Sequence, residues 1–236
     1  SMDTEYEAGV EMGKFFADKG IKTAAIYGAF IPNPMHVYRT AGVLAGLGLS
    51  YGGATTEEDV VGLIFADQGI DLSKISGDIK IVSYLQGYGD TTTDEINAAI
   101  QAAPEAFISV GMATTFFTQQ LNAAGIEFSD IDSFTKSNGE AITNGKLVYL
   151  AGKYSSSVGP AFALVMNAIN GNVIRDAQGN AVSLSQNYQV ATDSETFDKF
   201  YKNDNGDNPI YSRDTLDQII GDTVTFDTIN EVVASN

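Results

Sequence analysis

Arg39 is the residue whose type and position offer the clearest ligand chemistry in this sequence. It follows an apolar run from Thr23 to Tyr27 and the polar loop IPNPMHVY, and it opens the segment RTAGVLAGL. A guanidinium at such a position can donate two forked hydrogen bonds to a pair of hydroxyl groups or to a carboxylate. The alternative is an ion pair with an acidic residue of the same protein, and the sequence leaves both open.

Aromatic residues near the ends of two apolar runs offer a second kind of chemistry, the stacking of rings on a ligand. Tyr27 and Phe30 end or follow the first run, and Tyr84 and Tyr88 end or follow a later run, IKIVSY. Aromatic faces stack well on sugars and on nucleobases. Each of these side chains, taken singly, is also typical of a protein core.

Motifs that commonly mark catalysis or metal binding are incomplete. His36 is the only histidine and no partner stands at metal-binding spacing, so we expect a surface loop residue near a ligand mouth. The run DNGDN lacks the glutamate of a calcium loop, the glycine-rich fragments lack nucleotide-binding spacing, and no nucleophile elbow is present. The sequence therefore predicts no catalytic residue, no metal site, no cofactor and no enzyme activity.

The segments around these residues alternate between helical and strand patterns. Residues 6–20 predict an amphipathic helix, and residues 39–49 predict a second helix rich in small residues. Strands are predicted at residues 23–27, 79–84, 106–110 and 127–132, with helical patterns between them. This alternation predicts an α/β fold with an open parallel sheet and helices on both of its faces. Ligands of such sheets bind at the carboxyl ends of the strands.

The character of the sequence changes near residue 150. LVYLAGKY is typical of a strand, and the apolar residues of 159–170 predict a helix with one apolar face. VIRDAQGNAVSL is typical of a hairpin, and short helices around polar loops follow it. We therefore divide the chain into an α/β ligand-binding lobe, residues 3–150, and a partly irregular C-terminal extension, residues 151–236.

The charge balance restricts the class of partner. The 236 residues include 30 acidic and 13 basic side chains, which gives a formal net charge of −17. Such a surface repels phosphate backbones and anionic lipid, so we expect no nucleic-acid binding and no binding to a membrane surface. The chain has no cysteine, which excludes disulfides and thiolate chemistry.

Taken together, these segments resemble the type 1 periplasmic binding proteins, which include sugar receptors and the effector domains of lac-repressor-type regulators. The resemblance depends on the order of AGVEMGKFFADKGIKTAAIYG, RTAGVLAGL, AAPEAFISV and NGEAITNGKLVYLAGKYSSSVGPAFALVMNAINGN. It covers most of residues 6–172, and residues 54–74 look like an insertion. In that family two α/β lobes close on a ligand. The resemblance implies that this chain is the carboxyl-terminal lobe and that the amino-terminal lobe is missing from it.

The resemblance also implies a set of ligand-binding residues. Arg39 matches the arginine that holds ligand hydroxyls, Tyr88 falls near a stacking position, and Asp132 falls near the acid after the fourth strand. Tyr27, Phe30 and Met112 complete the predicted set. Val110-Gly111-Met112 stands where the family usually has an Asn-Asp pair, and Gly152-Lys153 stands where it often has a glutamine. These departures weigh against a typical pentose or hexose.

The function that the resemblance implies is binding without catalysis. We expect an extracytoplasmic solute-binding component of an ABC importer, in the periplasm or anchored as a lipoprotein, with a small-molecule ligand and a permease as partners. The alternative is the effector-binding domain of a lac-repressor-type transcriptional regulator. Because the helix at residues 159–170 would lose its usual partner with the missing lobe, we also predict that the chain forms a homodimer.

Overall fold

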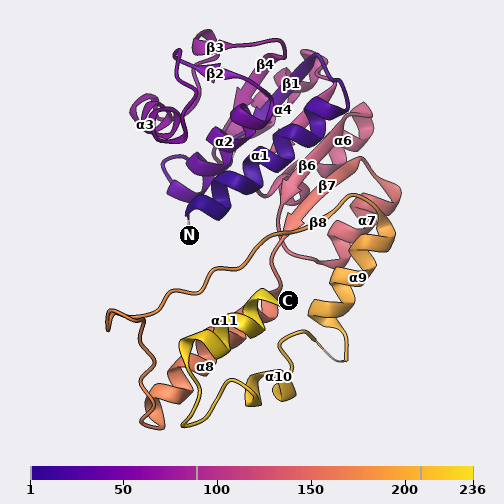
Figure 1. Ribbon diagram of the computed structural model, residues 1–236. Helices are drawn as coiled ribbons and strands as arrows, with labels where there is room; N and C mark the ends of the chain where they lie inside the picture. The colour runs from indigo at the N-terminus through magenta and orange to yellow at the C-terminus, as the bar shows by residue number, and fades with distance from the viewer. Residues whose placement is uncertain (1, 89, 208, 236) are drawn as a thin grey trace.

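The computed structural model describes residues 2–88, 90–207 and 209–235, and its centre is one six-stranded sheet (Figure 1). The strand order is β4-β1-β5-β6-β7-β8; the first five strands run parallel, and β8 runs antiparallel to β7. The strands are β1 (Thr23–Tyr27), β4 (Lys80–Leu85), β5 (Ala106–Ser109), β6 (Glu127–Ile131), β7 (Leu147–Gly152) and β8 (Gln189–Ala191). The predicted α/β class with a mostly parallel sheet is confirmed.

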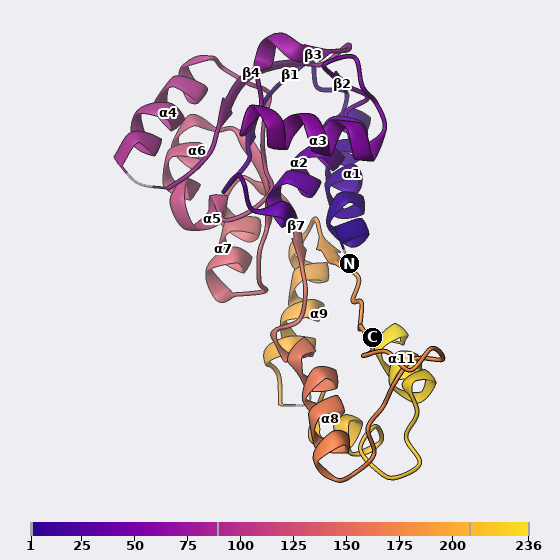
Figure 2. The same cartoon turned by 90° about the vertical axis from the view of Figure 1, so that its left-hand side faces the viewer.

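Helices cover both faces of this sheet (Figure 2). One face carries α1 (Met2–Asp18), α2 (Pro34–Gly46) and α3 (Glu57–Asp67). The other face carries α4 (Asp90–Gln101), α5 (Ala113–Phe116), α6 (Thr118–Ala124) and α7 (Lys136–Asn144). Strand β1 is buried on both sides, as the short, continuously apolar sequence TAAIY predicts for a central parallel strand.

Helix α2 begins at Pro34 rather than at Arg39, where the sequence pattern placed its start. The side chain of Asn33 accepts a hydrogen bond from the backbone N–H of Met35, and Pro34 occupies the first turn, where its missing N–H costs nothing. Arg39 therefore lies in the second turn of the helix. Its side chain is carried into the protein instead of standing at the helix start.

The small residues of α2 pack against α1. Gly9 and Gly13 of α1 face Gly42 and Gly46 of α2 across the helix contact. A Cβ atom added at Gly42 would lie 2.1 Å from the carbonyl oxygen of Tyr6, and one at Gly9 would lie 2.2 Å from that of Arg39. The two backbones therefore touch, which only glycine permits.

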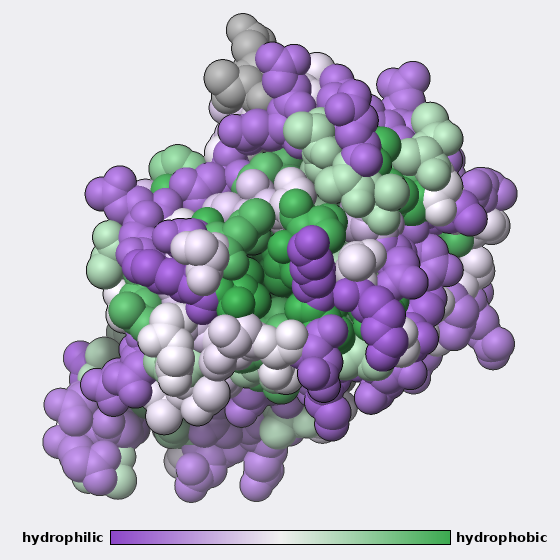
Figure 3. All heavy atoms as spheres, turned by 90° about the horizontal axis from the view of Figure 1, so that it is seen from above, coloured by the Kyte–Doolittle hydropathy of each residue, from purple (hydrophilic) through white to green (hydrophobic). Residues whose placement is uncertain are grey.

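The predicted insertion forms a small layer above the amino ends of the strands. It contains the helix α3 and the turn η1 (Leu72–Lys74), and it is flanked by β2 (Ser50–Tyr51) and β3 (Ile75–Ser76), which pair antiparallel. Figure 3 shows apolar side chains gathered in a hollow on this face. An open groove of about 730 Å³ lies here, with Leu72, Ile75, Ile79 and Val82 among its lining residues.

The C-terminal extension is shared between the lobe and a second cluster of helices. Strand β8 and helix α9 (Ser194–Asn205) join the lobe, and Phe197 and Phe200 belong to its core. The second cluster contains η2 (Ser155–Ser157), α8 (Val158–Ile169), α10 (Arg213–Asp217) and α11 (Phe226–Ala234). It has its own small core, formed by Ala163, Ile174, Ile219, Ile229 and Val233. The two cores thus divide the chain differently from a single boundary at residue 150.

One face of α8 is left exposed in this arrangement. Val158, Phe162, Val165 and Ile169 follow helical spacing and are 51% to 71% exposed. No helix among the described residues is long and apolar enough to cross a membrane.

Candidate functional site

The carboxyl edge of the sheet contains a topological switch point. The connection that leaves β1 leads through α2 to β4 on one side, and the connection that leaves β5 leads through α5 and α6 to β6 on the other side. The two loops diverge from this point, and ligands of open α/β sheets commonly bind at such switch points. The loops after β1 and β5 carry Phe30 and Met112.

Four exposed apolar side chains gather at this edge, and we call them the aromatic rim: Phe30, Tyr88, Met112 and Phe116. They are 37% to 48% exposed, although they are large and apolar. The rings of Phe30 and Tyr88 are nearly parallel, with centroids 6.2 Å apart and an interplanar angle of 14°. The rings of Tyr88 and Phe116 are also in contact, with centroids 5.2 Å apart. Exposed aromatic side chains in one continuous group mark binding sites more often than isolated ones do.

The loops that carry the rim are fastened to each other. The N–H of Gly28 donates to the carbonyl of Leu85, and the N–H of Gly87 donates at 2.6 Å to the carbonyl of Ala29. The hydroxyl of Tyr27 donates to the carbonyl of Gly87 at 3.1 Å. Tyr27 itself is fully buried, so this predicted ligand residue supports the rim from below and does not face a ligand.

Backbone strain is present in both loops. Ala29 has φ 53° and Met112 has φ 68°, so two non-glycine residues adopt left-handed conformations immediately beside or within the rim. Such conformations cost about 1–3 kcal/mol each and persist where the surrounding structure fixes them, often at ligand sites. At this edge the strained residues are Met112 itself and Ala29, which directly precedes Phe30.

Two carboxylates lie behind the Met112 side of the rim. Asp130 is fully buried at the end of β6 and accepts hydrogen bonds from the hydroxyl of Ser109 and from both the N–H and hydroxyl of Thr114. Burial raises the pKa of Asp130 to about 6, against the opposing hydrogen bonds of Thr114, and the charge of Asp132 adds to the rise. Asp130 therefore anchors the start of α5, and with it the loop that carries Met112.

Asp132, a predicted ligand residue, lies partly exposed after the end of β6. One of its oxygens accepts from the N–H of Ser133, and the other accepts from the hydroxyl of Thr114 at 3.2 Å and the amide of Asn138 at 3.3 Å. Its carboxylate is a partly exposed acceptor that hydrogen-bonds Thr114, two residues after Met112. A ligand at this edge would meet an acceptor there.

Arg39 lies beneath the edge and is only 5% exposed. Its Nε donates to Oε2 of Glu5 at 2.7 Å, its Nη1 donates to the carbonyl of Val110 at 2.9 Å, and its Nη2 donates to the hydroxyl of Tyr188 at 2.5 Å. All three guanidinium nitrogens thus have protein acceptors. The sequence left open a ligand contact or an internal ion pair, and the structure contains the ion pair.

Glu5 is the centre of this buried network. It also accepts from the hydroxyl of Tyr188 at 2.6 Å and pairs with Nζ of Lys153 at 3.2 Å. Burial alone would raise the pKa of Glu5, but the charge of Arg39, the hydrogen bonds of Tyr188 and Arg39 and the charge of Lys153 hold it below its usual value. The network joins α1 and α2 to the two segments that connect the lobe with α8, one from β7 to α8 and one from α8 to β8.

His36 is buried in the first turn of α2, and the expectation of a surface loop residue was wrong. Its Nδ1 lies 3.0 Å from both the N–H and the carbonyl oxygen of Phe30, and its Nε2 lies beside Gly111. Burial lowers the pKa of His36. The neutral ring therefore positions the loop of Phe30. The described residues contain no group of three or more histidine, cysteine, aspartate or glutamate side chains that could hold a metal.

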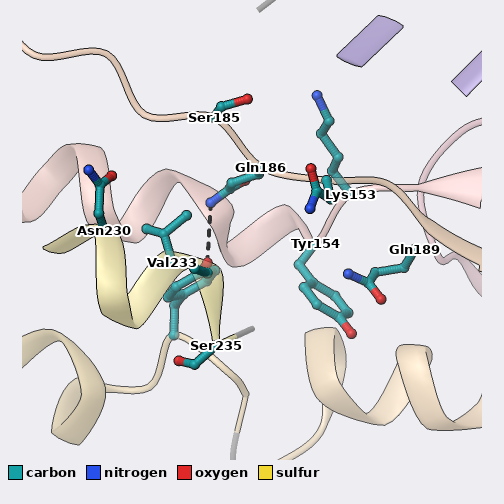
Figure 4. A pocket seen from close by; sticks show the side chains of 11 residues that line it. Lys153, Tyr154, Ser185, Gln186, Gln189, Asn230, Val233 and Ser235 are labelled. Atoms are coloured by element: carbon teal, nitrogen blue, oxygen red, sulfur yellow. Dashed lines mark hydrogen bonds between the residues drawn. The ribbon is translucent and has the colours of Figure 1, made fainter. Parts of the chain in front are cut away.

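A separate cavity of about 410 Å³ lies between the connecting segments and the end of α11 (Figure 4). Lys153 and Tyr154 line it from the end of β7, Gln186 lines it from the second segment, and Tyr211 and Val233 close it. Gln186 Nε2 donates to the Tyr211 hydroxyl at 3.4 Å. No predicted ligand residue lines this cavity.

Comparison with solved structures identifies the fold. An ABC transporter periplasmic solute binding protein from Actinobacillus succinogenes 130z, with bound D-allose, matches with a TM-score of 0.54 at 15% identity. A galactofuranose binding protein matches with a TM-score of 0.58 at 10% identity. The arabinose-binding component of an ABC transporter from Shewanella sp. ANA-3 matches with a TM-score of 0.54 at 16% identity.

The chain has the fold of a type 1 periplasmic binding protein. The three matches cover 83%, 85% and 84% of this chain but only 60%, 62% and 60% of the solved chains. The chain therefore spans about three fifths of the length of these proteins with the type 1 fold. No family model matches the sequence, and no curated protein matches it either.

Within this fold, the aromatic rim lies at the carboxyl edge of the sheet. Of the predicted set, Phe30 and Tyr88 are in contact at this edge, Met112 lies exposed in the loop after β5, and Asp132 accepts from Thr114, two residues after Met112. Phe116 was not predicted from the sequence. It ends the short helix α5, and its ring contacts the ring of Tyr88. The only indication of this role in the sequence was that Phe116 follows shortly after the end of the predicted strand at residues 106–110. Tyr27 and Arg39 lie below this group as supports.

Proposed function

We propose that this chain is the ligand-binding lobe of an extracytoplasmic solute-binding protein that serves an ABC importer. The observation that carries the proposal is the aromatic rim, which is exposed at the switch-point edge of a type 1 fold. A small molecule is held there by contacts and released intact, with no bond broken. The similarity of the fold to periplasmic binding proteins of ABC transporters supports this assignment.

An effector-binding domain of a transcriptional regulator is the competing function for this fold. The formal net charge of −17 disfavours a protein that works on a phosphate backbone. The exposed edge and the acidic surface fit a receptor that meets its permease outside the cytoplasm. We therefore place the chain in the periplasm or on the cell surface.

The rim predicts a direct binding test. Nuclear magnetic resonance titration of the 236-residue chain with a panel of sugars, nucleosides and amino acids should shift resonances of Phe30, Tyr88, Met112 and Phe116 with at least one compound. Replacing Tyr88 with alanine should weaken that binding about tenfold, because a stacking face is lost. If every compound in the panel left the rim resonances unchanged, the proposed function would be wrong.

The exposed face of α8 predicts self-association. Val158, Phe162, Val165 and Ile169 form an apolar stripe that a second copy of the chain can cover. Sedimentation should show a dimer fraction that grows with concentration, and Val165→Asp with Ile169→Asp should abolish it. Leu72→Asp, at an exposed apolar residue on another face, is the matched control and should leave the dimer intact. A wild-type chain that stays monomeric at every concentration contradicts the prediction.

A further inference from the structure

We infer that the ligand of the aromatic rim is an uncharged compound with a flat heteroaromatic ring, of the class of nucleosides and nucleobases, and not a free sugar. The inference deepens the proposed function and depends on it, because both concern the same edge of the sheet. Three observations carry it: the shape of the apolar surface, the engagement of the basic groups and the charge of the groups that remain.

The rim exposes aromatic rings that contact one another. The rings of Phe30 and Tyr88 are stacked at an interplanar angle of 14°, and the rings of Tyr88 and Phe116 are tilted by 34°, so the three side chains form one aromatic group. Met112 extends it at the start of the helix that carries Phe116. A flat heteroaromatic ring can stack on an exposed face of this group, and every base has a π-face suited to aromatic side chains. Aromatic faces also stack on sugars, but the hydroxyls of a free sugar need hydrogen-bond partners that ring faces do not supply.

The groups that would recognise a pair of sugar hydroxyls are already bound to the protein. Each nitrogen of Arg39 donates to Glu5, to the Val110 carbonyl or to Tyr188. His36 uses Nδ1 to hold the backbone of Phe30. A hydroxyl pair that displaced Glu5 from Arg39 would leave a carboxylate buried without its partner, which is strongly unfavourable.

The charged groups that remain at this edge are carboxylates, which attract hydrogen-bond donors of a ligand and repel anionic ligands. Asp132 is partly exposed and offers acceptor oxygens, and Asp130 lies behind it. An N–H or amino group on the edge of a heteroaromatic ring can donate to Asp132. A phosphorylated ligand would instead meet carboxylates on a chain that already carries a formal charge of −17. The ligand class is therefore neutral and rich in ring N–H or amino donors.

The test is a magnetic resonance titration of the full 236-residue chain with adenosine, guanosine, cytidine, D-allose, L-arabinose and adenosine monophosphate. We expect at least one nucleoside to shift the rim resonances and to bind at least tenfold tighter than either sugar. The monophosphate should bind more weakly than adenosine. Tyr88→Ala and Phe116→Ala should each weaken nucleoside binding about 5-fold to 100-fold, as loss of a stacking face does, while Tyr88→Phe should retain most of it.

Phe162→Ala is the matched control, because Phe162 is a phenylalanine with 51% exposure on α8, outside the rim. It should leave nucleoside binding unchanged. Sugars that shift the rim resonances and bind as tightly as the nucleosides would overturn the inference and leave the proposed function standing. The inference would also be overturned if none of the six compounds shifted the rim resonances, or if the monophosphate bound more tightly than adenosine. The proposed function would be wrong as well only if no compound of the wider panel shifted these resonances.

Discussion

Replacing Glu5 with glutamine is expected to lower the free energy of unfolding by about 3–5 kcal/mol at neutral pH, because it leaves Arg39 buried without its counter-charge. Glu5 is 5% exposed and contacts Arg39, Tyr188 and Lys153. Its loss therefore loosens α2 and both connecting segments at once. Urea denaturation, followed by circular dichroism, measures the change.

The same variant should change how stability depends on pH. The folded-state pKa of Glu5 lies below its ordinary value of 4.5, because the charge and hydrogen bonds of its partners outweigh burial. The stabilisation from ionised Glu5 is therefore fully present above about pH 4.5 and is lost as the pH falls through the lower folded-state pKa. The difference in stability between the wild type and Glu5→Gln should be largest at pH 7 and should shrink below pH 4.5.

Glu7→Gln is the matched control, because Glu7 lies on the same helix but is exposed. Its effect should stay within about 0.5 kcal/mol, as surface substitutions usually do. The double variant Glu5→Leu with Arg39→Met removes both charges together and should recover part of the stability that Glu5→Gln loses. A Glu5→Gln variant as stable as Glu7→Gln would show that the buried network contributes nothing.

Replacing Gly42 with alanine is expected to destabilise the protein by about 2–3 kcal/mol, although alanine is the better helix former. The added methyl group would lie 2.1 Å from the carbonyl oxygen of Tyr6 and 2.9 Å from the N–H nitrogen of Val10. Both atoms belong to the backbone of α1, so no side chain can turn away, and the two helices must separate. In a chain of this size the midpoint of thermal unfolding should fall by about 5–10 °C.

Gly62→Ala is expected to change the stability of the protein in the opposite direction. Gly62 lies in α3, and an added Cβ there meets no atom within 4 Å. The substitution should stabilise the protein by about 0.5–1 kcal/mol through helix propensity and a less flexible unfolded chain. If Gly42→Ala and Gly62→Ala changed the free energy of unfolding in the same direction, the close contact between α1 and α2 could not explain the effect of Gly42→Ala.

Local patterns predicted the class of the fold because they depend on neighbours in the chain. The apolar run TAAIY, the helix signals before and after it and their repetition along the chain required a parallel sheet with helices on both faces. The start of α2 was misplaced because the capping by Asn33 competes with a plausible later start at Arg39. The division at residue 150 also differs from the two observed cores, because β8 and α9 return to the lobe through contacts distant in sequence.

The candidate site was only partly visible in the sequence. Phe30, Tyr88, Met112 and Asp132 could be placed near one edge, because the carboxyl ends of parallel strands meet there. Arg39 and Tyr27 could be placed near it too, but their burial could not be read from spacing. Phe116 was missed because its contact with Tyr88 joins two loops that are distant in the chain.

By itself, the sequence determined an acidic, cysteine-free chain with an α/β fold and a mostly parallel sheet, and ligand binding at the carboxyl edge of that sheet stays a prediction. Periodicity, capping and charge are local or additive properties, so they survive without coordinates. Only the tertiary structure decided what Arg39 does. The acceptors of Arg39 come from Glu5, Val110 and Tyr188, which the chain separates widely, and their approach turns a predicted ligand residue into a buried support. The same packing leaves the aromatic rim as the exposed surface on which a ligand can settle.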